Sequence, residues 1–161
     1  MKKVPKQLIS LRVNGTDYEL AVSPNRTLLE VLREDLMLKG VKEGCDDGSC
    51  GTCTILLDGA PVRSCLYLAV EATGKELTTI EGLAEGDRLH PIQQAFVDHG
   101  AIQCGYCTPG MILTAKALLD RNPAPTDQDI KIAISGNFCR CTGYNKIVTA
   151  IKMAGQSAVR R

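Results

Sequence analysis

The chain has 161 residues with eight cysteines, and its 19 lysines and arginines nearly balance its 18 aspartates and glutamates. This length allows one ordinary domain or two small ones. The balanced charge gives no sign of a polyanionic partner, and the absence of tryptophan disfavours a base-stacking surface, so we expect no nucleic acid partner.

The targeting signals that a sequence can carry are weak here. Basic residues at the amino terminus are followed by polar residues and not by an apolar stretch, which disfavours a secretory signal. The longest apolar run, around residues 66–70, is too short to span a bilayer. We therefore expect a cytoplasmic chain with no membrane span. In that compartment cysteine clusters bind metal more often than they form disulfides.

The first half of the chain is expected to form strands with one helix. Apolar segments joined by Asn-Gly at 14–15, and again by Asp-Gly at 58–59, predict two hairpins. Thr27 is placed to cap a short helix, with Glu30 as the third residue after the cap. The last strand is expected at 77–80.

The second half is expected to be helical. Thr126 and Asp129 form a capping-box pattern after a proline-rich connection at 122–125. The polar, glycine-containing stretch 81–88 predicts a domain boundary, giving domains 1–82 and 83–161. Domains of this size often depend on a metal for stability. The four expected helices cover residues 92–97, 111–119, 129–134 and 146–153.

The first cysteine group has the spacing of a plant-type 2Fe–2S site. Cys45, Cys50 and Cys53 give C-x4-C-x2-C, and Cys65 follows as a fourth thiol. Glycines in the loop 40–53 allow the backbone to wrap closely around a flat cluster and to donate amide hydrogen bonds to its sulfurs. Two disulfides or a zinc site are the alternatives. Zinc sites with four cysteines usually pair two C-x2–4-C units, and this group has only one.

The second cysteine group is less specific by spacing alone. Cys104 and Cys107 form C-x2-C and Cys139 and Cys141 form C-x-C, and each pair precedes an expected helix. Helix amino termini favour thiolates and anionic clusters. Because the spacing of this group is not specific to a cluster, zinc remains an alternative here. A thioredoxin-like redox site is disfavoured, because the neighbouring elements are helices.

Three ordered motifs together carry a family resemblance. They are Gly44-Cys45-Asp46 with 50–54, then 103–111, then 136–144. They closely resemble the iron–sulfur subunit of the xanthine oxidase (molybdenum hydroxylase) family, most of all its xanthine dehydrogenase-type small subunits. The resemblance implies an α+β chain: an N-terminal β-grasp, plant-type ferredoxin-like domain and a C-terminal four-helix bundle. It also implies a 2Fe–2S cluster on the second cysteine group.

The resemblance further implies a place in a complex. The C-terminal cluster would lie nearest a molybdopterin cofactor in a separate large subunit, and the N-terminal cluster nearer FAD, usually in a third, medium subunit. Electrons would pass from molybdenum through both clusters to FAD. Gln103 and Cys141 resemble the residues that contact the pterin. The complex is expected to be a heterotrimer or a dimer of heterotrimers, with this chain as its non-catalytic subunit.

Some alternatives stay open at the level of sequence. A free-standing ferredoxin would explain the first half, and a zinc-stapled interaction module would explain the cysteines alone. Tyr106, Phe138 and Tyr144 flank expected ligands, where they either shield a cluster from solvent or simply pack. Substrates among relatives are purines, N-heterocycles, aldehydes, carbon monoxide and hydroxybenzoyl thioesters. Segments 64–69 and 79–82 look most like the purine-type subunits.

Overall fold

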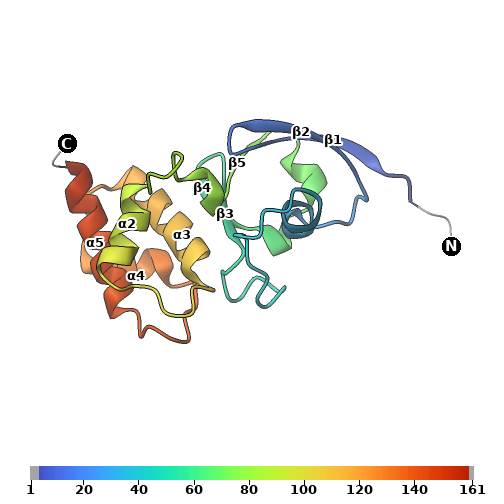
Figure 1. Cartoon of the computed structure of the whole chain (residues 1–161). Coiled ribbons are helices and arrows are strands. Elements are labelled where there is room, and N and C mark those ends of the chain that lie inside the picture. Colours follow the sequence, from blue (N-terminus) through green and yellow to red (C-terminus); the bar gives the residue numbers. More distant parts are fainter. Residues whose placement is uncertain (1–3, 160–161) are drawn as a thin grey trace.

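Figure 1 shows the computed structural model of the chain, which describes residues 4–159. The first three and last two residues of the two expected domains lie outside this part. A sheet half and a helical half lie side by side, with the two chain ends at opposite extremes of the molecule (Figure 1). The α+β organisation is therefore confirmed.

The sheet half contains five strands in the order β2-β1-β5-β3-β4. β1 and β5 pair in parallel, and the other neighbours are antiparallel. This mixed sheet with a helix packed on it is the expected β-grasp arrangement. The strands are β1 (Gln7–Val13), β2 (Thr16–Val22), β3 (Thr54–Leu57), β4 (Ala60–Arg63) and β5 (Glu76–Thr78).

Both predicted hairpin turns are confirmed. Asn14 and Gly15 have φ of 52° and 80°, and Asp58 and Gly59 have φ of 50° and 79°. Positive φ at both turn residues is the geometry that suits the right-handed twist of the flanking strands. The predicted last strand was too long, because Thr79 donates its backbone N–H to Asn14 Oδ1 at 2.9 Å instead of extending the ladder. A 3-10 turn, η4 (Ile80–Gly82), follows directly.

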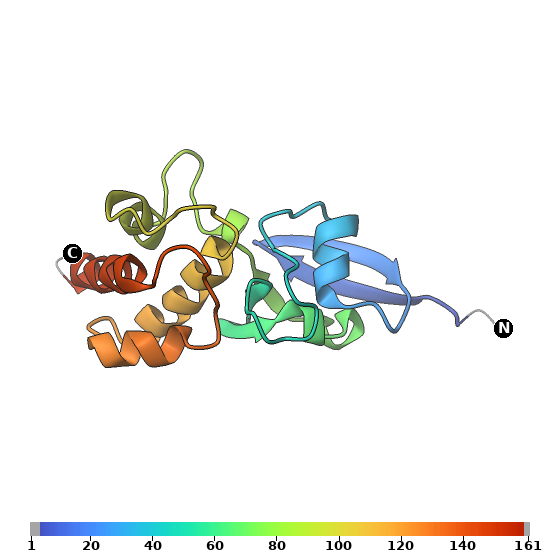
Figure 2. The ribbon, with the colours of Figure 1, turned by 90° about the horizontal axis from the view of Figure 1, so that it is seen from below.

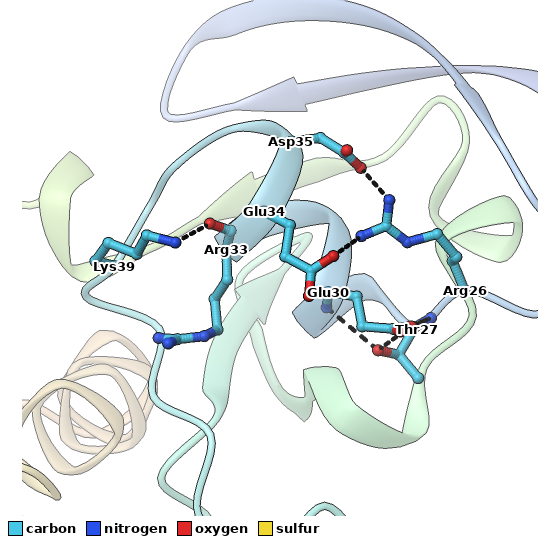
Figure 3. A network of polar contacts seen from close by, with 7 residues as sticks. All are labelled: Arg26, Thr27, Glu30, Arg33, Glu34, Asp35 and Lys39. Carbon is cyan, nitrogen blue, oxygen red and sulfur yellow. Dashed lines mark hydrogen bonds and ion pairs between the residues drawn. The ribbon is translucent and has the colours of Figure 1, made fainter.

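The predicted cap of the first helix is also confirmed, and Figure 3 shows it. Thr27 Oγ1 accepts from the N–H of Glu30, and the Glu30 carboxylate accepts from the N–H of Thr27 at 2.6 Å (Figure 3). The helix α1 (Leu28–Glu30) continues into a π-helical turn, η1 (Val31–Asp35). Arg26 spans that turn by donating to Glu34 and Asp35, each at 2.7 Å.

Four helices form the second half, as the sequence predicted. Most of these helices are longer than predicted by one or more residues at each end, because polar residues at the caps and last turns continue the helix beyond its apolar residues. His90 caps α2 and Thr126 caps α4 through capping boxes, of which only the second was predicted. The helices are α2 (Pro91–Asp98), α3 (Thr108–Arg121), α4 (Asp127–Ile134) and α5 (Asn145–Val159).

Two apolar cores meet at strand β3. Ile55 and Leu57 point into the core beneath the sheet, whereas Leu56 belongs to the core of the helices. All four residues of β3 are buried, because α3 packs against the face of the sheet that α1 leaves free. Among the helices of the second half, α3 lies nearest the sheet (Figure 2). Two short 3-10 turns, η2 (Ser64–Leu66) and η3 (Ala69–Ala72), complete the sheet half.

Residues 4–159 include no helix that combines the length and the apolar character needed to cross a membrane.

Candidate metal centres

Three cysteines of the first group lie in the loop between η1 and β3, and the fourth approaches them from η2. Cys45 and Cys50 come from the glycine-rich turn, Cys53 ends that turn, and Cys65 lies in η2. The sulfurs of Cys53 and Cys65 lie 3.4 Å apart and are buried. The N–H of Cys50 donates to Cys45 Sγ at 3.3 Å. The structure therefore brings all four residues of this group to one loop cluster.

The surroundings of these thiols shift their pKa values in opposite directions. The Asp47 carboxyl raises the pKa of Cys45, but the N–H groups of Cys50 and Asp47 outweigh it and bring the pKa to about 7. Burial, together with the neighbouring Cys53 thiol, raises the pKa of Cys65 to about 12. A buried thiol of this kind becomes a good ligand only when a cation offsets the charge of its thiolate.

The second group lies where two loops of the helical half meet. Cys107 directly precedes α3, and Cys139 and Cys141 lie in the loop before α5. The sulfurs of Cys104 and Cys141 are 3.6 Å apart, and both residues are exposed. Cys107 and Cys139 are half-buried against the helical core. The expected helix-terminus setting is thus present for Cys107, whereas Cys141 is separated from α5 by a turn.

Polar contacts distinguish Cys139 and Cys107. Burial works against the Cys139 thiolate, but the side chain and N–H of Thr142 donate to Cys139 Sγ at 3.1 and 3.4 Å and lower its pKa overall. Burial raises the pKa of Cys107 to about 12. Tyr144 adds a further link, because its hydroxyl oxygen accepts from the N–H of Cys139 at 2.8 Å.

The arrangement of the sulfurs fits two binuclear centres. Within residues 4–159, no set of three or more histidine, cysteine or acidic side chains converges as if on one ion. Sulfurs approach in close pairs instead, at 3.4 Å for Cys53 and Cys65 and 3.6 Å for Cys104 and Cys141. Two thiolates on one tetrahedral metal lie about 4 Å apart at usual metal–sulfur lengths. A 2Fe–2S cluster requires two such pairs, one on each iron, and each cysteine group shows one of them at this separation.

The other residues singled out in the sequence lie at the surface or between the two loops. Gln103 is exposed beside the exposed Cys104. The hydroxyl of Tyr106 donates to the carbonyl of Glu43, which joins the two halves. Phe138 is 56% exposed, so it does not shield a cluster from solvent within this chain.

Sequence reasoning missed the polar residues that hold the two loops together. Asn137 is buried, and its side-chain amide reaches the carbonyl of Gly51, 86 positions away in the chain. Arg63, the last residue of β4, donates to the carbonyl of Gly136 at 2.6 Å. The position of Asn137 two residues before Cys139 was the only local signal for its role.

The chain was compared with protein families. A "2Fe-2S iron-sulfur cluster binding domain" matches residues 11–84, and a "[2Fe-2S] binding domain" matches residues 79–152. Each match contains one of the cysteine groups. The family models therefore support a 2Fe–2S cluster in each half, and the zinc alternatives are set aside.

Individual relatives match over nearly the whole chain. The small FeS subunit of nicotinate dehydrogenase from Eubacterium barkeri is 53% identical over 149 residues, covering 92% of this chain and 95% of that protein. The iron-sulfur-binding subunit of xanthine dehydrogenase from Escherichia coli O157:H7 is 46% identical over 145 residues, covering 89% and 91%. The chain belongs to the iron–sulfur subunits of the molybdenum hydroxylase (xanthine oxidase) family.

A solved structure gives the same result for the fold. Quinoline 2-oxidoreductase from Pseudomonas putida 86 superposes with a TM-score of 0.93 at 46% sequence identity, over 97% of this chain and 98% of the matched chain. As a member of this family, the chain is a non-catalytic electron-transfer subunit of an oxidoreductase. The likeness over both halves disfavours the free-standing ferredoxin, which would leave the helical half unexplained.

Proposed function

We propose that the two cysteine groups are the ligands of the two clusters. Cys45, Cys50, Cys53 and Cys65 would hold the N-terminal cluster, and Cys104, Cys107, Cys139 and Cys141 the C-terminal one. The close sulfur pair in each group, within a domain matched to 2Fe–2S proteins, is the observation that carries this assignment. Each cluster carries one electron at a time when bound.

The exposure of the cysteines indicates which cluster a partner subunit can approach. Cys104 and Cys141 are exposed at the end of the second group, whereas Cys53 and Cys65 are buried within the sheet half. A partner that donates electrons can therefore approach the C-terminal cluster closely. We assign Gln103 and Cys141 to contacts with the molybdopterin of that partner, which fits the exposed side chain of Gln103.

The partners follow from the family. We propose that this chain assembles with a large molybdenum-cofactor subunit and with a medium subunit that binds FAD, in a heterotrimer or a dimer of heterotrimers. Electrons then leave the molybdenum site through the C-terminal cluster, pass to the N-terminal cluster and reach FAD.

In this proposal the substrate of the complex is a purine or another nitrogen heterocycle, with an aldehyde as the alternative because aldehyde oxidoreductases are 44% and 46% identical to the chain. Relatives named for nicotinate and xanthine are 53% and 46% identical to the chain, and the structural relative is named for quinoline. All three compounds contain a ring nitrogen. The purines that segments 64–69 and 79–82 suggest are therefore one case of a broader class of nitrogen heterocycles.

We further propose that residues 1–82 and 83–161 form the two domains and that the chain works in the cytoplasm. The two separate cores support this division, although Ile80 already packs against the helices. Eight free cysteines that must remain thiolates for iron support a reducing compartment.

The test is co-purification followed by spectroscopy. The chain is expressed together with its neighbouring large and medium subunits and purified through a tag on this chain. We expect molybdenum, four irons per chain and two distinct EPR signals after reduction. Elution of the tagged chain alone would contradict the subunit assignment, and a colourless protein containing two zinc ions would contradict the cluster assignment.

A further inference from the structure

The ligand loop of the N-terminal cluster is held by the ligand loop of the C-terminal one. The N–H of Phe138 donates to the carbonyl of Cys50 at 2.8 Å. The side-chain amide of Asn137 donates to the carbonyl of Gly51 at 2.9 Å. Two successive carbonyls of the first loop are therefore bound by two successive residues of the second.

Asn137 is fixed in its orientation by its other contacts. Its amide nitrogen also donates to Thr54 Oγ1 at 3.2 Å, and its Oδ1 accepts from Thr114 Oγ1 at 3.1 Å. The residue is only 3% exposed. Because a buried amide is stable only when its donors and acceptors are paired, this side chain has one favoured position.

Arg63 makes the reciprocal connection from the sheet half. It donates to the carbonyl of Gly136 at 2.6 Å, to that of Gly48 at 3.2 Å and to Thr54 Oγ1 at 3.3 Å. Thr54 lies between Arg63 and Asn137 and receives a hydrogen bond from each. We call Thr54, Arg63 and Asn137 the cross-brace.

Peptide geometry links the cross-brace to the cluster. In a trans peptide the C=O of one residue and the N–H of the next point in opposite directions, and the chain has no cis peptide bond among its described residues. Tying the carbonyls of Cys50 and Gly51 to the second loop therefore turns the N–H groups of Gly51 and Thr52 away from it.

These two N–H groups are available to a ligand. Gly51 and Thr52 are buried, and neither N–H has a protein acceptor among the described residues. Buried backbone N–H groups are rarely left without an acceptor. Both residues lie between Cys50 and Cys53, where a cluster bound to these cysteines would present its sulfurs.

We propose that Asn137 is a positioning residue for the N-terminal cluster, although it lies in the motif of the C-terminal one. It orients the amides of Gly51 and Thr52, whose hydrogen bonds stabilise the reduced, more negative form of the cluster. The helical half then helps to set the electrochemistry of the cluster in the sheet half. This inference rests on the ligand assignment proposed above.

The experiment is an EPR-monitored reductive titration of the intact complex, with the signals assigned through Cys65→Ser and Cys104→Ser variants. Asn137→Ala removes the donor that the second loop supplies to the Gly51 carbonyl, which keeps its hydrogen bonds from the N–H and the hydroxyl of Thr54. We expect the equilibrium of the N-terminal cluster to shift about tenfold toward its oxidised form, equivalent to about 59 mV for one electron. The shift of the C-terminal cluster should be smaller.

Two further variants separate positioning from simple packing. Thr114→Val removes the donor to Asn137 Oδ1 but keeps the hydrogen bonds that the amide nitrogen donates, so the N-terminal cluster should shift much less than in Asn137→Ala. Thr142→Ala, five residues along the same loop, removes a donor to Cys139 and should shift the C-terminal cluster instead. If Asn137→Ala fails to fold, Arg63→Lys should shift the N-terminal cluster in the same direction.

The outcomes are distinct. Two signals in the unaltered complex with no selective shift in Asn137→Ala, or an equal shift in Thr114→Val, would overturn the inference and leave the ligand assignment standing. Loss of neither signal in the two cysteine variants would overturn the assignment, and the inference would fail with it.

Discussion

At the scale of residues, this protein depends on a few backbone positions where the two loops approach closely. Gly51 has φ of +72°, and a Cβ built on it would lie 2.3 Å from the carbonyl oxygen of Gly136. A Cβ on Gly110 would lie 2.5 Å from the carbonyl oxygen of Gly51. Glycine is needed at both positions for space, and at Gly51 for conformation as well.

Gly51→Ala should therefore destabilise the chain strongly. The left-handed conformation alone costs a residue with a side chain about 1–2 kcal/mol, and the contact with Gly136 adds at least as much again. Gly59→Ala is the matched control, because Gly59 has φ of +79° but no atom within 4 Å of its Cβ position. Urea unfolding of both variants measures the difference, and equal losses of stability would contradict the close approach.

At the scale of elements, caps define where the helices begin. Thr126 and its partner Asp129 were readable from sequence, because threonine and an acidic residue three positions later form the usual capping box. His90 was not, since histidine is an uncommon cap. Its Nδ1 accepts from the N–H of Ile92 at 3.3 Å, and Gln93 completes the box by accepting from the N–H of His90 at 2.9 Å.

The His90 cap should make the start of α2 sensitive to acid. Burial lowers the pKa of His90, with the Lys116 cation acting in the same direction against Asp120 and Glu85. The unfolded chain therefore binds this proton more readily. The stabilisation is complete above the unfolded pKa of about 6.5 and is lost as the pH falls toward the folded pKa.

A His90→Asn variant provides the measurement. Asparagine keeps a cap acceptor that does not titrate. Between pH 7 and pH 5, the free energy of unfolding should fall less in this variant than in the unaltered chain, while the carboxylates contribute equally to both. An equal or steeper fall in the variant would show that His90 does not cap α2 as its neutral form.

At the scale of the whole molecule, two small cores are joined through one buried strand and one polar interface. β3 contributes to both cores, and Asn137 and Arg63 cross between the ligand loops. All four thiols of each group nevertheless come from one half of the chain. Each cluster should therefore assemble on its own ligands, even though its surroundings include the other half.

Cys104→Ser should remove the C-terminal EPR signal and leave the N-terminal one. The exposed position of Cys104 makes the substitution easy to accommodate, and none of the other group's ligands is altered. The same measurement on Cys65→Ser should give the opposite result. Loss of both signals in either variant would mean that the two halves cannot bind their clusters separately.

Removal of iron should lower the stability of the whole chain. Each half is near the size at which an apolar core alone gives little net stability, and a bound metal adds its binding energy to folding. We expect the melting temperature of the iron-free chain to fall by about 10 °C or more, with recovery after reconstitution with iron and sulfide. An unchanged melting temperature would indicate that the clusters do not staple the fold.

The sequence by itself determined the parts of this protein that depend on local order. C-x4-C-x2-C spacing, Asn-Gly and Asp-Gly turns, the Thr27 cap and the apolar pattern of four helices are all written in neighbouring residues. For the second cysteine group, spacing alone left zinc open, and the family motifs were needed to indicate a cluster. The matches to relatives then supported that reading.

Only the tertiary structure decided how the two halves meet. Asn137 and Gly51 are 86 positions apart, and no pattern of neighbouring residues predicts that one side chain will hold the other's carbonyl. Leu56 lies on the face of β3 opposite Ile55 and Leu57, and its burial likewise depends on α3 packing against the sheet. Local sequence places the cysteines, and long-range packing sets the surroundings in which we propose that they hold iron.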